Sequence, residues 1–211
     1  MQPERFTSKL QSALGDAQSL AVGKDHNYIE PVHLLLALLD QQGGSVRPLL
    51  VQSGANVNQL RTSVHQMFSD LPQVSSHDGE LRFSPNMGKL FNLTDKLAQQ
   101  RGDQYIASEL FVLAMLDDKS GVGKLLSQAG VTKQNLEQAI TQMRGGEGVN
   151  DPNAEETRNN RQQCHYERTL LCRRYADLCN IYPRGRQRKL KPVHHSGSGR
   201  YRYVWRTRDL Y

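Results

Sequence analysis

The chain has 211 residues, 37% of them hydrophobic and 23% charged, which is enough apolar sequence for a packed core although it lies on the polar side of globular proteins. Its apolar run Leu34–Leu39 is six residues long, far short of the roughly 20 residues that a membrane-spanning helix needs, and no apolar run follows a basic start, as a secretory signal requires. The three cysteines are an odd number, which argues against a disulfide framework, so we expect a cytoplasmic protein with no membrane partner.

Charge divides the chain into two parts. Residues 1–150 carry 13 Lys and Arg against 15 Asp and Glu, whereas residues 151–211 carry 14 against 6. The second part also holds all three cysteines, the one tryptophan and six of the eight tyrosines. Two compositions therefore meet near residue 150.

The first part contains an internal repeat. Seventeen identical pairs appear when residues 6–40 are shifted by 77 and residues 46–67 by 76, with one slip of a single residue between the two blocks. The pairs are Phe6/Phe83, Leu20/Leu97, Ala21/Ala98, Tyr28/Tyr105, Ile29/Ile106, Leu36/Leu113, Ala37/Ala114, Leu39/Leu116, Asp40/Asp117, Val46/Val122, Leu49/Leu125, Leu50/Leu126, Gln52/Gln128, Gly54/Gly130, Leu60/Leu136, Gln66/Gln142 and Met67/Met143. Each copy is therefore one structural unit of about 65 residues.

The first half of each copy has the signals of two helices. Thr7 and its counterpart Ser84 can cap a helix, and Pro85 fits the first helical position because its missing N–H is not needed there. Apolar residues then recur at spacings of three and four, which predicts an amphipathic helix. A second helix is predicted to start near Pro31 and Ser108, and it is apolar nearly all round, which indicates a buried, central position.

The second half of each copy predicts two more helices. Gly54 and Gly130 are well placed to end a short helix. Asn56 and Thr132 can then cap the last helix of each copy. Four helices in each of two copies predict an all-α, eight-helix domain in which the copies pack about a pseudo-two-fold axis.

These signals define the expected domain organisation. The domain should occupy residues 1–145, with repeat one at 6–70 and repeat two at 83–145. Residues 146–157, which begin directly after Gly145 with a second glycine, are typical of a flexible linker. Residues 158–211 are expected to be a basic, largely disordered tail, because they lack a periodic apolar face.

The repeat resembles the Clp repeat domain, which is the N-terminal domain of Clp ATPases, and is most like that of the ClpB-type disaggregases. The resemblance covers roughly residues 1–157. The segments that carry it are residues 17–21, 28–39, 43–46, 49–50, 95–103 and 106–114, and the exit at 143–147 looks like the linker of that family. The resemblance implies a non-catalytic, mobile domain on a hexameric unfoldase that binds unfolded or aggregated protein. The alternative is a stand-alone adaptor or regulatory protein that binds a specific folded partner.

The resemblance also implies a shallow substrate-protein site with a polar and an apolar group of residues. The polar group matches Thr7, Asp103 and Glu109, and the apolar group matches Leu93, Leu97 and Leu110. From the residues themselves, simpler roles are available: Thr7 as a helix cap, Glu109 as a carboxylate in a first helical turn, and the leucines as core.

Residues 1–150 show no catalytic group, metal site or cofactor motif that the residues support. The segment Ser120–Lys124 resembles a phosphate-binding loop only superficially, because Asp118 stands where that loop needs a glycine and Leu125 where it needs Ser or Thr. We therefore expect no nucleotide binding and no enzymatic activity.

The tail admits three interpretations. Cys164, Cys172 and Cys179 with the histidine pair at 194–195 could supply zinc ligands, but they lack a C-x-x-C spacing. Its Arg- and Tyr-rich stretches would attract polyanions through charge, without a fold for specific nucleic-acid recognition. The leading hypothesis is a lost coding frame, because the composition changes abruptly near residue 158; reading the gene in its other two frames tests this.

Overall fold

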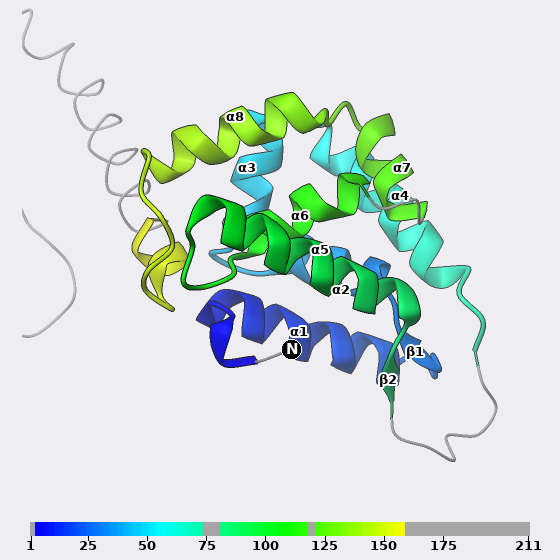
Figure 1. The fold of residues 1–211 in the computed structure, drawn as a ribbon. Helices are drawn as coiled ribbons and strands as arrows, with labels where there is room; N and C mark the ends of the chain where they lie inside the picture. Colours follow the sequence, from blue (N-terminus) through cyan, green and yellow to red (C-terminus); the bar gives the residue numbers. More distant parts are fainter. Residues whose placement is uncertain (1–2, 74–80, 118–120, 159–211) are drawn as a thin grey trace, which may run out of the picture. The chain divides into compact units, whose positions relative to one another are not determined.

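The computed structural model describes residues 3–73, 81–117 and 121–158 (Figure 1). The expected tail from residue 159 on, with its cysteines, lies outside the described residues. A 3₁₀ turn, η1, opens the chain, and short strands precede α2 and α5. In chain order the elements are η1 (Pro3–Arg5), α1 (Ser8–Val22), β1 (Tyr28–Ile29), α2 (Pro31–Asp40), α3 (Val46–Gln52), α4 (Val57–Ser69), β2 (Arg82–Phe83), α5 (Pro85–Arg101), α6 (Ser108–Asp117), α7 (Gly121–Gln128) and α8 (Lys133–Arg144).

The predicted helix signals are confirmed. The side chains of Thr7, Asn56, Ser84 and Thr132 each accept a hydrogen bond from a backbone N–H three residues further on, at the starts of α1, α4, α5 and α8. Gly54 and Gly130 follow α3 and α7 with φ of +89° and +92°, a conformation that favours glycine. Local chemistry thus sets where these helices begin and end.

The two copies are related as the repeat predicts. Helix α1 packs on α2 as α5 packs on α6, and each central helix also contacts the last helix of its own copy. Between the copies, α3 contacts α8 and α4 contacts α7, which is the same pair of contacts with the copies exchanged. This exchange is what a pseudo-two-fold axis produces, so the all-α architecture of two four-helix copies is confirmed.

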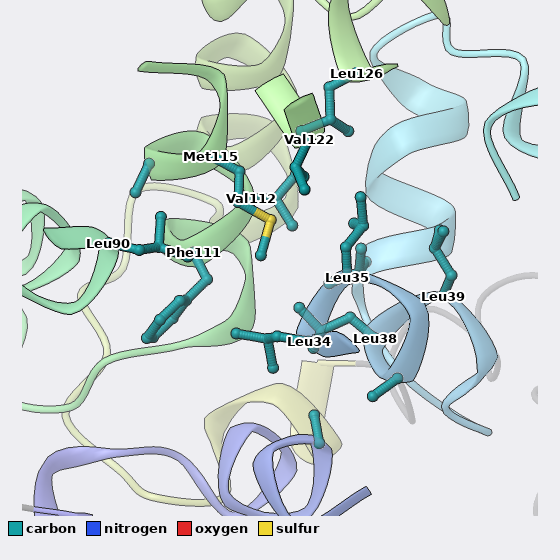
Figure 2. Packing of buried hydrophobic residues seen from close by; sticks show 14 of the residues in the cluster. Leu34, Leu35, Leu38, Leu39, Leu90, Phe111, Val112, Met115, Val122 and Leu126 are labelled. Carbon is teal, nitrogen blue, oxygen red and sulfur yellow. The ribbon is translucent and has the colours of Figure 1, made fainter. Parts of the chain in front are cut away.

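The core lies where α2 and α6 meet (Figure 2). Leu34, Leu35 and Leu38 of α2 are fully buried, as are Phe111 and Met115 of α6. Figure 2 shows these side chains directed into the same interior, with residues of α5 and α7 around them. Both central helices are covered on nearly every side, which matches their nearly all-round apolar sequence. None of the described helices is long and apolar enough to cross a lipid bilayer.

Two strands were not predicted from the sequence. Strands β1 and β2 are two residues each and pair in parallel, with Ile29 opposite Phe83, and an isolated parallel bridge joins Phe6 to Ile106. Phe6 corresponds to Phe83 and Ile29 to Ile106, so each copy pairs with the other at equivalent residues. The all-α expectation for residues 1–145 is therefore wrong in this detail, because the chain leading into α1 and into α5 pairs with backbone groups of the other copy.

The segment expected to be a flexible linker packs on the domain instead. The carbonyl of Val149 accepts hydrogen bonds from the N–H groups of Gln104 and Tyr105, at 3.0 and 2.9 Å, and the carbonyl of Pro152 accepts one from Ser8 at 2.9 Å. Residues 154–158 form a helical turn. The expected domain end at residue 145 is therefore too early, because backbone groups further along already find partners in the fold.

Candidate functional site

Thr7, the first of the predicted polar site residues, is completely buried against Glu155. Its hydroxyl donates a hydrogen bond of 2.5 Å to Oε1 of Glu155, a residue 148 positions away. The same oxygen accepts from the backbone N–H of Ser108 at 3.0 Å and from its hydroxyl at 3.1 Å. The second carboxylate oxygen, Oε2, accepts from the hydroxyl of Ser45 at 2.8 Å. One carboxylate therefore binds residues at the starts of three helices, α1, α3 and α6.

Glu155 is 1% exposed. Burial and the negative charge of Glu109 raise the pKa of its carboxyl above the ordinary value of a glutamate, and the hydrogen bonds from Thr7, Ser108 and Ser45 act in the opposite direction. A buried carboxylate is tolerated only when its lone pairs are satisfied. The four donated hydrogen bonds supply that satisfaction.

Asp103 and Glu109, the other two predicted polar residues, share one guanidinium. Arg144 donates from Nη1 to Asp103 at 2.7 Å and from Nε to Glu109 at 3.0 Å, and all three side chains are at least 95% buried. Burial acts to lower the pKa of Arg144, but the charges of Glu109 and Asp103 and the hydrogen bonds to both outweigh it and raise the pKa.

The same two carboxylates also hold the segment that follows α8. Asp103 accepts a hydrogen bond from the backbone N–H of Val149 at 2.9 Å. Glu109 accepts one from Arg158 at 3.1 Å. Within the described residues, Oε2 of Glu109 and Nη2 of Arg144 have no hydrogen-bond partner. The three predicted polar residues thus lie together, and each binds residues 144–158 of its own chain.

The predicted apolar residues do not form one surface. Leu93 and Leu97 of α5 are partly buried and pack on the core with part of each side chain exposed. Leu110 is 0% exposed and belongs to the core. Its expected place in a shallow surface patch is therefore wrong, because α6 is the central helix of its copy and is covered on every side.

The equivalent place in the first copy has different chemistry. The counterparts of Asp103, Leu110 and Arg144 under the repeat shifts are His26, His33 and Phe68. The two imidazoles meet at 2.8 Å, Nδ1 of His26 to Nε2 of His33, and the rings lie edge to face with Phe68 at centroid distances of 5.1 and 5.4 Å.

Hydrogen bonds tie this pair to the backbone. Nδ1 of His33 lies 3.0 Å from the backbone N of Glu30 and 3.3 Å from the Glu30 carbonyl oxygen, and the shorter distance favours Nδ1 as acceptor from the N–H and Nε2 as donor to His26. Burial and His26 lower the pKa of His33 to about 4. Burial first, and then Lys24, lower the pKa of His26. Both rings are therefore neutral near neutral pH.

The sequence pattern did not point to Arg144 or Glu155. A signal for Arg144 was available in the repeat: against the first copy, Asp103 replaces His26, Glu109 replaces Val32 and Arg144 replaces Phe68, so three charges arise together. No comparable signal exists for Glu155, because it lies beyond the repeated residues. Only the folded chain brings it to Thr7.

A shallow groove of about 650 Å³ lies between α1 and α2. Leu20, Ala37 and Phe68 contribute apolar surface to it, and Lys9 and Asp16 are among its polar lining residues.

Comparison with known proteins assigns the same residues to one family. A family model described as the Clp repeat (R) N-terminal domain matches residues 5–129. The chaperone protein ClpB of Vibrio cholerae serotype O1 is 52% identical over 158 residues, which is 75% of this chain and 18% of the relative. The chain thus spans about a fifth of the length of this curated relative.

Solved structures agree with the fold. The Hsp104 N-terminal domain from Candida albicans matches with a TM-score of 0.64 at 22% identity, over 71% of this chain and 98% of that domain. A ClpV N-domain, solved in complex with a VipB peptide, matches with a TM-score of 0.56 at 23% identity, over 69% of this chain and 90% of that one. At these identities the likeness concerns the fold.

Proposed function

Because the chain belongs to the Clp repeat N-terminal domain family, we propose that it recognises unfolded or aggregated polypeptide for a ClpB-type ATP-dependent disaggregase. Domains of this family are the non-catalytic parts of Clp ATPases. The observation that carries the proposal is the 52% identity with ClpB of Vibrio cholerae over 158 residues. The proposed partners are exposed hydrophobic segments of client proteins and, through the rest of a ClpB-type chain, its hexamer.

The surface offered to a client begins at α5. Leu93 and Leu97 lie one turn apart, so their exposed parts form one apolar strip on this helix. Phe83, just before α5, is 49% exposed and packs edge to face on Phe91 at 5.2 Å. Partly exposed apolar groups on a rigid helix can hold an exposed hydrophobic segment without selecting its sequence.

We propose that the polar residues Thr7, Asp103 and Glu109 assist this binding. Each is paired within its own chain, and Asp103 and Glu109 already bind a backbone N–H or a cation, which are groups that a client also carries. Their use by a client requires residues 149–158 to move. Binding should therefore be weak, with a dissociation constant of about 10 μM or higher.

The test compares the unfolded and native forms of one labelled model protein, by fluorescence anisotropy, against the full chain. We expect saturable binding of the unfolded form alone. The double variant Leu93→Ser, Leu97→Ser should weaken it at least about fivefold, because apolar contact area is lost. Val51→Ser on α3 is the matched control, since Val51 is 63% exposed and apolar. Equal weakening by the control, or none by the α5 variant at unchanged thermal stability, would place the client site elsewhere.

A second function is a stand-alone adaptor that binds one defined partner. It is favoured by the ClpV N-domain of similar fold, which was solved with a VipB peptide bound. The same assay separates the two functions. Tight binding of a particular folded protein, with no affinity for unfolded chains, would support the adaptor.

A further inference from the structure

The two copies bind a carboxylate at the same place, but they obtain it from different sources. At the start of α5, the hydroxyl of Ser84 donates to Oε2 of Glu30 at 2.8 Å, and Glu30 directly precedes α2 within the repeat. The counterpart of Ser84 is Thr7, and the counterpart of Glu30 is Ala107, which has no carboxylate. Glu155, from beyond the second copy, supplies the missing carboxylate to Thr7.

The groups around Glu155 select a carboxylate. Three hydroxyls and one backbone N–H, from Thr7, Ser45 and Ser108, all donate to its two oxygens. Thr7 directly precedes α1 and Ser108 opens α6, where the partial positive charge of the helix end also favours an anion, and Ser45 directly precedes the short helix α3. An acceptor with two oxygens and negative charge fits this set, and a cation does not.

The segment that delivers Glu155 is held mainly by polar contacts. Between residues 145 and 158, only Val149 and Glu155 are buried. The segment begins with Gly145 and Gly146, which have φ of +62° and +83°, and a third glycine, Gly148, follows. Segments with few buried apolar contacts open at low free energy. The buried carboxylate adds to this, because burial opposes its charge.

We propose that Thr7, Ser45 and Ser108 form a binding site for a peptide carboxylate, that Glu155 occupies it as a releasable internal ligand, and that an acidic side chain of a client polypeptide binds there in its place. That the incoming carboxylate belongs to a client rests on the proposed function, whereas the site and its internal ligand do not. Occupation by a client frees residues 149–158 from the domain. Client binding at this site is therefore coupled to whether residues 149–158, the segment that follows the domain, are bound to it or released.

The test uses three forms of the full chain: the parent, Glu155→Ala, and the control Glu156→Ala. Glu156 is the adjacent carboxylate, 49% exposed in its side chain, and its ion pair with Lys9 spans 3.6 Å. The probe is a labelled decapeptide with the sequence of residues 149–158 and blocked ends, so that only side chains carry charge. A second peptide has alanine in place of the residue equivalent to Glu155.

We expect Glu155→Ala to bind the first peptide saturably and the second at least about tenfold more weakly, because hydrogen bonds to a charged acceptor are among the stronger ones. The parent and Glu156→Ala should bind it at least about tenfold more weakly than Glu155→Ala does, since their own Glu155 competes for the site. Amide hydrogen exchange at Gln104, Tyr105 and Ser8 should accelerate about tenfold or more in Glu155→Ala alone, because these groups bind the segment.

Equal binding of both peptides, or no binding by a folded Glu155→Ala, would overturn the carboxylate site. Such a result with normal binding of the unfolded model protein by the parent would leave the proposed function standing. Conversely, peptide binding without any client binding would keep the site and reject the proposed function.

A second variant covers the case in which Glu155→Ala does not fold. Val149→Ser weakens the other buried point of the segment, so faster amide exchange at Ser8 together with binding of the first peptide is then expected. If Val149→Ser shows neither the faster exchange nor the peptide binding, Glu155 is a fixed part of the fold and the proposal is overturned.

Discussion

Near the end of the last helix of each copy is a position where the two copies differ in chemistry. In the first copy this residue is Phe68, which packs edge to face on the neutral rings of His26 and His33. In the second copy it is Arg144, which binds the carboxylates of Asp103 and Glu109. The helices are arranged alike in both copies, so the difference lies in the side chains.

This difference explains why the cluster of the second copy binds a segment beyond the repeat, whereas the cluster of the first copy bonds within its own copy. In the aromatic cluster both ring nitrogens of His33 are hydrogen-bonded, one to the backbone of Glu30 and the other to His26. The ionic cluster has hydrogen-bonding capacity left over, and it uses that capacity to hold Val149 and Arg158. The second copy therefore depends on residues outside the repeat.

Loss of Arg144 should have the largest effect on this comparison. Arg144→Ala leaves the buried carboxylates of Asp103 and Glu109 without their cation, and the free energy of unfolding should fall by about 3–5 kcal/mol. Urea unfolding followed by circular dichroism measures this. Arg61→Ala is the control, because Arg61 pairs with Asp40 at 2.7 Å with side chains 45% and 40% exposed, and solvent screening leaves such an exposed pair with little effect on stability.

Replacing the three charged residues of the second copy by uncharged ones tests whether charge pairing is what distinguishes the two copies. In the triple variant Asp103→Asn, Glu109→Val, Arg144→Phe, these three positions no longer carry a buried charge, and the amide oxygen introduced at position 103 can still accept from Val149. The variant should lose less stability than Arg144→Ala alone and remain within about 2 kcal/mol of the parent. A larger loss in the triple variant than in Arg144→Ala would mean that packing, not charge pairing, distinguishes the copies.

Removing the capping hydroxyls of α1 and α5 should lower the free energy of unfolding by unequal amounts, and the difference should be smaller than the effects above. Ser84→Ala should reduce the free energy of unfolding by about 1 kcal/mol, as loss of a helix cap does, because water can replace its hydroxyl at the half-buried Glu30. Thr7→Ala also removes a donor from the buried Glu155, so its loss should be about 2–3 kcal/mol. Equal losses in the same urea experiment would show that Glu155 does not depend on Thr7.

The smallest expected difference is in how the free energy of unfolding depends on pH, because the buried histidine His33 belongs to the first copy. The pKa of His33 is about 4 in the folded chain, below its ordinary value of about 6.5 in an unfolded one. Between these values the unfolded chain binds the additional proton, so the contribution of the neutral ring is fully present above about pH 6.5 and is lost as the pH falls toward 4. One proton gives a slope of at most about 1.4 kcal/mol per pH unit.

His33→Leu isolates this contribution, because leucine is the residue at the equivalent position 110. The free energies of unfolding of parent and variant should be compared from about pH 4 to about pH 7, where the parent should lose more stability as the pH falls. Carboxylates that titrate in this range affect both proteins and cancel in the difference. Parallel curves would show that His33 is not kept neutral by the fold.

Much of the fold could be predicted because its signals are local. Thr7, Asn56, Ser84 and Thr132 cap helices through bonds that span three residues, and the apolar spacing that marks each helix face extends over a few turns. The strands β1 and β2 could not be predicted, because two residues carry no periodicity and their partners lie in the other copy.

The structure brings the polar residues of the predicted site together and moves one of its apolar residues into the core; that they form a client site stays a prediction. Thr7, Asp103 and Glu109 do lie together, as the family resemblance implied. Leu110 was expected at a surface but is buried, because spacing within a helix shows which residues share a face and not how many neighbours cover the helix.

The repeat, the eight helices and the family could all be inferred from the amino-acid sequence, since each depends on short-range chemistry or on a comparison of one copy with the other. The folded chain was needed to show that Arg144 joins Asp103 to Glu109 and that Glu155 reaches Thr7 across 148 residues of chain. A buried carboxylate or guanidinium must find partners wherever the fold provides them, and separation along the chain carries no information about that choice.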